Sequence, residues 1–138
     1  MPIIGINFDK ISVEKRKPVQ APLNIGVNVK VLDMEKEEMS FSTKDTSVLR
    51  INFAFQLKYE PKIADLTLAG HLHFMEDKKA IEDLMNRWKK EKKMDPNISK
   101  LLLNAVLVKC HTKALYMAQE VNLPPHIRMP ILENKGKQ

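Results

Sequence analysis

The sequence predicts the α+β class, with a four-stranded antiparallel sheet and two helices packed on one face of it. Two observations predict this class. In the first half of the chain apolar residues recur with a period of two, which is typical of strands with one buried face. In the second half the spacing changes to three and four, which is typical of amphipathic helices. With 138 residues, 43% of them apolar, the chain can form one core, so we expect a single domain over residues 1–138.

The clearest strand signal lies at residues 48–59. Its apolar side chains share one parity and are Leu49, Ile51, Phe53, Phe55, Leu57 and Tyr59. Residues 63–75 repeat the alternation after the short segment "EPKI". Because so few residues join the two runs, we expect them to form a long antiparallel hairpin.

Two further strands are expected at residues 3–14 and 25–34. The second of these alternates regularly. In the first, the apolar parity changes between Phe8 and Ile11, so one residue must be absorbed near Asp9. The sequence therefore predicts a β-bulge or a break at this position.

The first helix is expected at residues 78–93. Its apolar residues recur every three or four positions, and Asp77 is suited to be its N-cap. Pro96 should end this helix, and Asp95 or Asn97 can cap the next.

The second helix, at residues 98–121, is apolar over most of its circumference. A helix on one face of a small sheet needs only about a third of its surface to be apolar, so this helix has a second apolar side to bury. We therefore expect a symmetric homo-oligomer, a dimer or a tetramer, built partly on this helix. The predicted interface residues are Leu101, Leu102, Val106 and Val108.

The formal net charge of +6 is concentrated in lysine-rich clusters, including "RWKKEKK" at residues 87–93. Such clusters attract nucleic acid or anionic lipid, and Trp88 among cations would suit stacking on a single strand. The helical spacing of Trp88 from apolar neighbours favours a packing role instead, and a solvated helix face explains the lysines. A basic module that binds nucleic acid is retained as an alternative.

The residue types needed for catalysis do not form a recognisable pattern. The four glycines are isolated, which excludes a glycine-rich phosphate loop, and Cys110 is the only cysteine. His71 and His73 share one side of a strand with Asp65, so a metal pair is conceivable, but two polar residues on a hydrated sheet face are the favoured interpretation. We predict no catalytic residues, no metal, no cofactor and no enzyme activity.

Targeting signals and membrane segments are also not expected. The longest apolar run, "LLLNAVLV", is too short to span a bilayer, and "MPIIGINFDK" lacks the features of a signal peptide. We expect a cytoplasmic protein without membrane insertion.

Residues 122–132, "NLPPHIRMPIL", contain three prolines among apolar residues. Proline fixes φ and lacks an N–H, so this segment should be extended and outside any central strand. Its apolar content is too high for a free tail. Either it lies across the rest of the protein or it forms a surface that other chains contact.

Taken together, these features resemble the SecB-like chaperone family. The similarity runs through "INFDKISVE…APLN" (6–24), "INFAFQLKYEPKIADLTLAGHLHF" (51–74) and the proline segment that follows the long helix. The resemblance implies dimers that pair into a tetramer and an ATP-independent holdase, a chaperone that keeps non-native polypeptide clients from aggregating. It also implies that the proline segment lines an apolar groove, with peptide-binding residues at Leu123, Ile127, Met129 and Ile131.

The chain departs from the acidic export SecB, because it is basic and ends in "ENKGKQ" without metal ligands. Docking to an export motor in protein transport is therefore not implied. A dedicated partner-binding protein, such as an antitoxin chaperone, and a structural subunit of a larger assembly are retained as alternatives to a general holdase.

Overall fold

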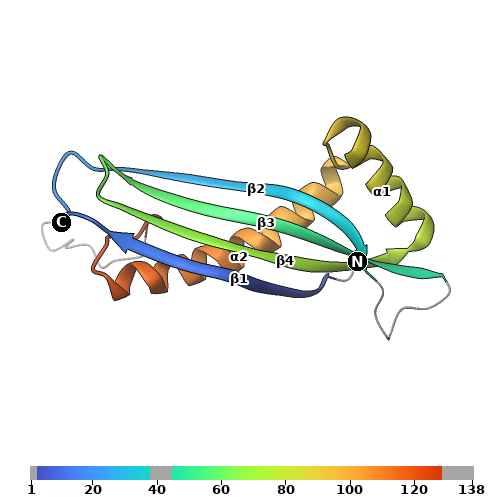
Figure 1. Cartoon of the computed structure of the whole chain (residues 1–138), viewed down its shortest axis with the longest axis horizontal. Helices are drawn as coiled ribbons and strands as arrows, with labels where there is room; N and C mark the ends of the chain where they lie inside the picture. The colour runs from blue at the N-terminus through green and yellow to red at the C-terminus, as the bar shows by residue number, and fades with distance from the viewer. Residues whose placement is uncertain (1–2, 38–44, 129–138) are drawn as a thin grey trace, which may run out of the picture.

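A computed structural model of the chain describes residues 3–37 and 45–128. Its elements, in chain order, are β1 (Ile3–Lys15), β2 (Asn24–Glu37), β3 (Thr46–Glu60), β4 (Ala64–Asp77), α1 (Lys78–Glu91) and α2 (Pro96–Glu120). The four strands form one antiparallel sheet in the order β1-β4-β3-β2. Both helices lie on the same face of this sheet (Figure 1). The predicted fold class is therefore confirmed.

The predicted hairpin is the centre of the sheet. Strand β3 has 15 residues, which corresponds to about 50 Å at roughly 3.4 Å per residue. In both β3 and β4 every second side chain is buried, and Phe55 pairs with Leu68 in the middle of the hairpin. At the turn, Lys62 has a φ of 52°, and the backbone N–H of Ile63 donates to the carbonyl oxygen of Tyr59 over 2.9 Å.

The predicted bulge in β1 is confirmed. The register with β4 shifts between Phe8 and Lys10, so that Phe8 lies opposite Gly70 and Ile11 lies opposite Leu68. This shift keeps apolar side chains of both halves of β1 on the helix side of the sheet. A Cβ atom on Gly70 would collide with the backbone of Asn7 and Phe8, which explains glycine at this position.

The helix ends follow the sequence signals. The Asp77 carboxylate accepts a hydrogen bond of 2.8 Å from the Ala80 N–H and caps α1. Asp95 accepts from the Asn97 N–H over 2.8 Å and caps α2. The second helix begins at Pro96, two residues before the predicted start at 98, because proline is tolerated in the first helical turn, where its missing N–H is not needed.

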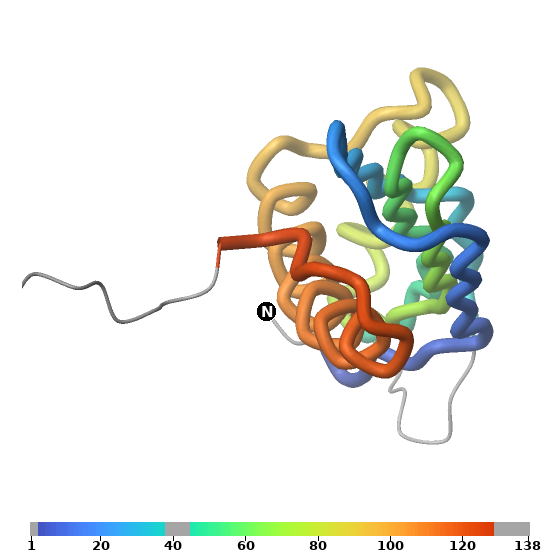
Figure 2. The backbone as a smooth tube through the Cα atoms, turned by 90° about the vertical axis from the view of Figure 1, so that its left-hand side faces the viewer, coloured from blue at the N-terminus to red at the C-terminus, as the bar shows by residue number. Residues whose placement is uncertain are grey.

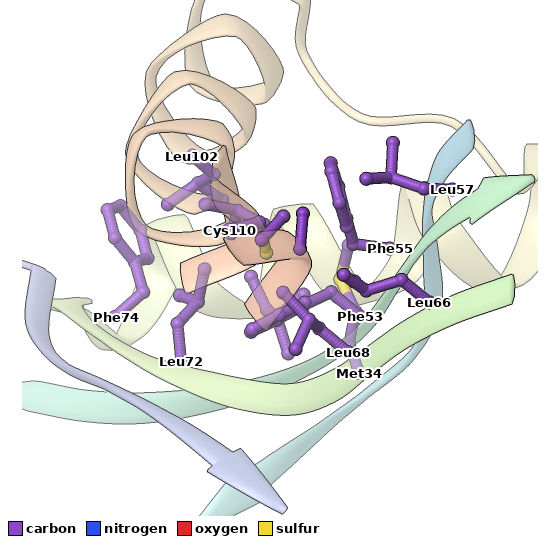
Figure 3. Close-up of a cluster of buried hydrophobic side chains, with 14 of the residues drawn as sticks. Met34, Phe53, Phe55, Leu57, Leu66, Leu68, Leu72, Phe74, Leu102 and Cys110 are labelled. Carbon is purple, nitrogen blue, oxygen red and sulfur yellow. The ribbon is translucent and has the colours of Figure 1, made fainter. Parts of the chain in front are cut away.

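The core lies between the sheet and α2. Figure 2, an end-on view, shows α2 running along one side of the sheet. Leu102 and Cys110 point from this helix toward the side chains of β3 and β4 (Figure 3). The buried residues of α2 recur at intervals of four and become small toward its C-terminus, in the order Leu102, Val106, Cys110, Ala114 and Ala118. The small residues let the helix approach the sheet closely.

Candidate functional site

Helix α2 has two apolar sides, as the sequence indicated. One side is buried against the sheet. The other side carries apolar residues that solvent can reach: Leu101 is 39% exposed, Val108 is 69% exposed and Tyr116 is 58% exposed. Val108 and Tyr116 are therefore more exposed than covered, and Leu101 is partly covered.

The four residues predicted as an oligomer interface do not share one surface. Leu102 is 1% exposed and Val106 is 2% exposed, because both belong to the core of the chain itself. Their assignment to an interface was wrong. The sequence of a helix that is apolar on all sides does not show which side faces the sheet. In this structure the side that faces the sheet carries Leu102, Val106 and Cys110, which are spaced four residues apart. Leu101 and Val108 remain on the outer side.

A groove of about 560 Å³ runs along the outer side of α2, beside β1. It is lined by Phe8, Ala105, Val108, Lys109, Thr112, Lys113 and Tyr116. The ammonium of Lys109 lies 5.7 Å from the centre of the Phe8 ring, and that of Lys113 lies 5.7 Å from the centre of the Tyr116 ring. The stems of the two lysines extend the apolar surface while their charges reach water.

The proline segment is attached to the end of the sheet. After α2 ends, Asn122 takes the left-handed conformation with a φ of 57°, and Leu123 is buried at 5% exposure. The Tyr59 hydroxyl donates to the carbonyl oxygen of Pro124 over 2.8 Å. Lys15 donates to the carbonyl oxygen of Val121 over 3.1 Å and so helps to satisfy the end of the helix.

A pair of histidines completes this attachment. Nδ1 of His111 lies 2.6 Å from Nε2 of His126, and the two rings stack with centroids 4.8 Å apart. Both rings make T-shaped contacts with the Phe55 ring, with centroids 5.4 Å apart for His111 and 6.1 Å apart for His126. Burial, and secondarily the neighbouring imidazole, lowers the pKa of His126 to about 4. His126 is therefore neutral near pH 7.

Sequence reasoning missed this pair. Within the described residues, Nδ1 of His126 is buried without a hydrogen-bond partner. A buried nitrogen without a partner is tolerated better as a lone pair than as an N–H. We therefore assign the proton of His126 to Nε2, which donates a hydrogen bond to Nδ1 of His111, and leave Nδ1 of His126 unprotonated. No sequence signal connects two histidines 15 positions apart when one of them lies in irregular structure.

The predicted peptide-binding residues have different positions. Leu123 belongs to the core, whereas Ile127 is 38% exposed on the attached segment. Met129 and Ile131 lie outside the described residues.

The other histidines do not converge with Asp65. His71 pairs with Asp9 over 2.8 Å, His73 pairs with Glu37 over 2.8 Å, and Asp65 pairs with Arg16. Across residues 3–37 and 45–128, no group of three or more His, Cys, Asp or Glu side chains is arranged to hold a metal ion.

Cys110 is fully buried under α2. Its burial raises the pKa of the thiol to about 12, which makes a reactive thiolate unfavourable. Trp88 is partly buried and packs against the core, as its helical spacing indicated. Among the described helices, none is long and apolar enough to cross a membrane.

Comparison with known proteins identifies a structural neighbour. No protein-family model and no curated protein sequence matches the chain. Among solved structures, the chain is similar to the Mycobacterium tuberculosis Rv1957 SecB-like chaperone, which was solved in complex with a ChAD peptide from the Rv1956 HigA1 antitoxin. The similarity covers 96% of this chain and 91% of that chain, with a TM-score of 0.54 and 10% sequence identity. The strand order, the two helices on one face and this similarity together identify the fold of the chain as SecB-like.

Proposed function

We propose that the protein is an ATP-independent chaperone that holds non-native polypeptide segments on apolar surface and so prevents their aggregation. The observation that carries this proposal is the groove beside α2. A SecB-like sheet and helix enclose the core, yet they leave Val108 and Tyr116 more than half exposed above it. Exposed apolar surface of this kind is typical of a site that binds other chains.

The chemistry of the groove suits clients of varied sequence. Phe8 and Tyr116 provide aromatic surface, and the flexible lysine side chains beside them can move aside. An extended segment would bury its apolar residues here without needing a fixed pattern of hydrogen-bond partners. Neither nucleotide nor cofactor is required, and the proposal assigns the protein to the cytoplasm, where nascent and unfolded chains occur.

The proline segment has a supporting role in this proposal. Leu123 and the Tyr59–Pro124 hydrogen bond would anchor it, and Ile127 would contact the client. Met129 and Ile131 are assigned to the same proposed surface from the sequence alone.

We further propose that the protein is a homo-oligomer, either a dimer or a tetramer, which associates through the first half of α2 around Leu101. Val108 lies two turns further along the helix, about 10 Å away at roughly 1.5 Å per residue. It would therefore lie where the oligomer contact meets the groove. Association there would cover part of the outer apolar side and leave the Tyr116 end open for clients.

A protein dedicated to one partner is the second candidate. The structural neighbour was solved with a peptide from one antitoxin, which supports a polypeptide ligand but also favours this narrower role. The two candidates differ in the range of clients that they bind, because a general holdase acts on unrelated unfolded proteins and a dedicated one acts on a single partner.

The test is suppression of light scattering by a chemically unfolded model protein diluted into buffer without nucleotide. A holdase should suppress aggregation at near-stoichiometric ratios. Tyr116→Ser should weaken the effect, whereas Gln119→Ser, at another exposed position on α2, should not. Lack of suppression by the folded wild-type protein would overturn the general holdase and leave the dedicated partner.

A further inference from the structure

A second hollow, separate from the groove beside β1, lies where β2 meets the end of α1 and the start of α2. Its volume is about 450 Å³. Aliphatic side chains, a tryptophan and four basic residues make up most of its lining: Val29, Val31, Met94 and Leu103; Trp88; and Lys30, Arg87, Lys92 and Lys93.

The walls of this pocket carry more positive charge than the acids beside them neutralise. None of the described residues that line it is Asp or Glu. Of the acids nearby, Glu91 pairs with Arg87 of the lining over 3.4 Å, and the Asp95 carboxylate caps α2. The positive charge that remains for a ligand is therefore that of the lysines. Clustered positive charge beside apolar walls attracts a ligand that joins an anionic group to an apolar one.

A polypeptide fits the pocket better than a nucleic acid does. A base needs an open aromatic face on which to stack. The Trp88 ring is partly buried against the core, and the ammonium of Lys92 lies over it at 5.5 Å from the ring centre. The remaining apolar wall is aliphatic, which suits leucine, isoleucine or phenylalanine side chains.

We propose that this pocket binds polypeptide segments in which an Asp or Glu stands next to a large apolar residue. The carboxylate would lie among the lysines, and the apolar side chain would pack against Val31 and Leu103. This inference rests on the proposed function insofar as the ligand is a polypeptide, and it adds a preference for acidic segments.

Trp88 provides the readout, because it is the only tryptophan in the chain. The probes are two short, tryptophan-free peptides with the same leucine and phenylalanine positions, one carrying glutamates and the other lysines. The glutamate peptide should change Trp88 emission saturably, and the lysine peptide should not. Equal responses to both peptides, or none to the glutamate peptide, would overturn the inference.

A pair of matched variants tests whether the pocket itself is responsible. Lys92→Glu with Lys93→Glu reverses two charges in the lining, whereas Lys89→Glu with Lys90→Glu reverses two exposed charges outside it. We expect the first pair to weaken binding of the glutamate peptide at least about tenfold and the second to change it less than about threefold. Equal losses would indicate general electrostatic attraction and would contradict a specific pocket.

Two further outcomes separate this inference from the proposed function. If a single-stranded oligonucleotide displaced the glutamate peptide at a lower concentration than the peptide itself, the pocket would be assigned to nucleic acid. If the protein suppressed aggregation but did not bind the glutamate peptide, only this inference would fail. If it bound the peptide through the pocket but did not suppress aggregation, only the general holdase would fail.

Discussion

Leu101 and Leu102 are adjacent residues of the same type on α2, and the fold gives them opposite environments. Leu102 is 1% exposed in the core and Leu101 is 39% exposed on the outer side. Truncation of Leu102 to alanine removes buried methyl groups and leaves a cavity under the helix. Substitutions of this kind cost 2–5 kcal/mol in close-packed cores, so we expect a loss of about 3 kcal/mol for Leu102→Ala.

For a domain of this size, that loss corresponds to a decrease in Tm of about 10 °C. Leu101→Ala should cost less than about 1 kcal/mol in the dissociated chain. The assay is thermal and urea unfolding followed by circular dichroism at several protein concentrations. The concentration series separates the stability of the chain from that of an oligomer, since only the latter depends on concentration.

The two variants should therefore differ both in how much stability they lose and in whether that loss depends on protein concentration. Leu102→Ala lowers the stability at every concentration, whereas any effect of Leu101→Ala should grow as the protein is concentrated. If both variants lost the same stability at high dilution, or if Leu101→Ala lost more, our orientation of α2 on the sheet would be wrong.

Four other substitutions test the oligomer contact, the attachment of the proline segment and the client surface. Val108→Asp, at an exposed position, should leave the circular dichroism spectrum unchanged and reduce the mass measured by light scattering; an unchanged mass would remove Val108 from the proposed oligomer contact. Tyr59→Phe deletes the hydrogen bond to the proline segment and should lower the free energy of unfolding by about 1 kcal/mol, measured in urea. Because the folded protein holds the pKa of His126 near 4, below its unfolded value of about 6.5, stability should fall as pH decreases through this window; His126→Gln should flatten this slope, and an unchanged slope would contradict the contribution of His126. Ile127→Ser should weaken suppression of aggregation without changing Tm, and full suppression by this variant would exclude Ile127 from the client surface.

Local patterns predicted the sheet well because they are strong and short-range. The parity of β3 and β4 determined which face is buried, and the parity change near Asp9 located the bulge. Asp77 and Asp95 were recognisable as helix caps because capping depends only on neighbouring residues.

The arrangement of α2 could not be predicted in the same way. A helix that is apolar all round has no preferred side in its sequence, so Leu102 and Val106 were assigned to an interface although the sheet covers them. The attachment of the proline segment could not be predicted from the sequence either. The contacts Tyr59–Pro124 and His111–His126 join residues from distant elements, and only the tertiary fold brings them together.

The central claim is that unfolded chains are held in the groove between α2 and β1. It is tested most directly by a photoreactive amino acid at Thr112, in the groove one turn before Tyr116, compared with one at Ser12. Ser12 lies on β1 opposite Thr67, on the other face of the sheet, and is also exposed. An unfolded client should crosslink at Thr112 and not at Ser12, and the same client in its folded form should crosslink at neither position. Equal crosslinking at the two positions, or none at Thr112 while aggregation is suppressed, would contradict the account.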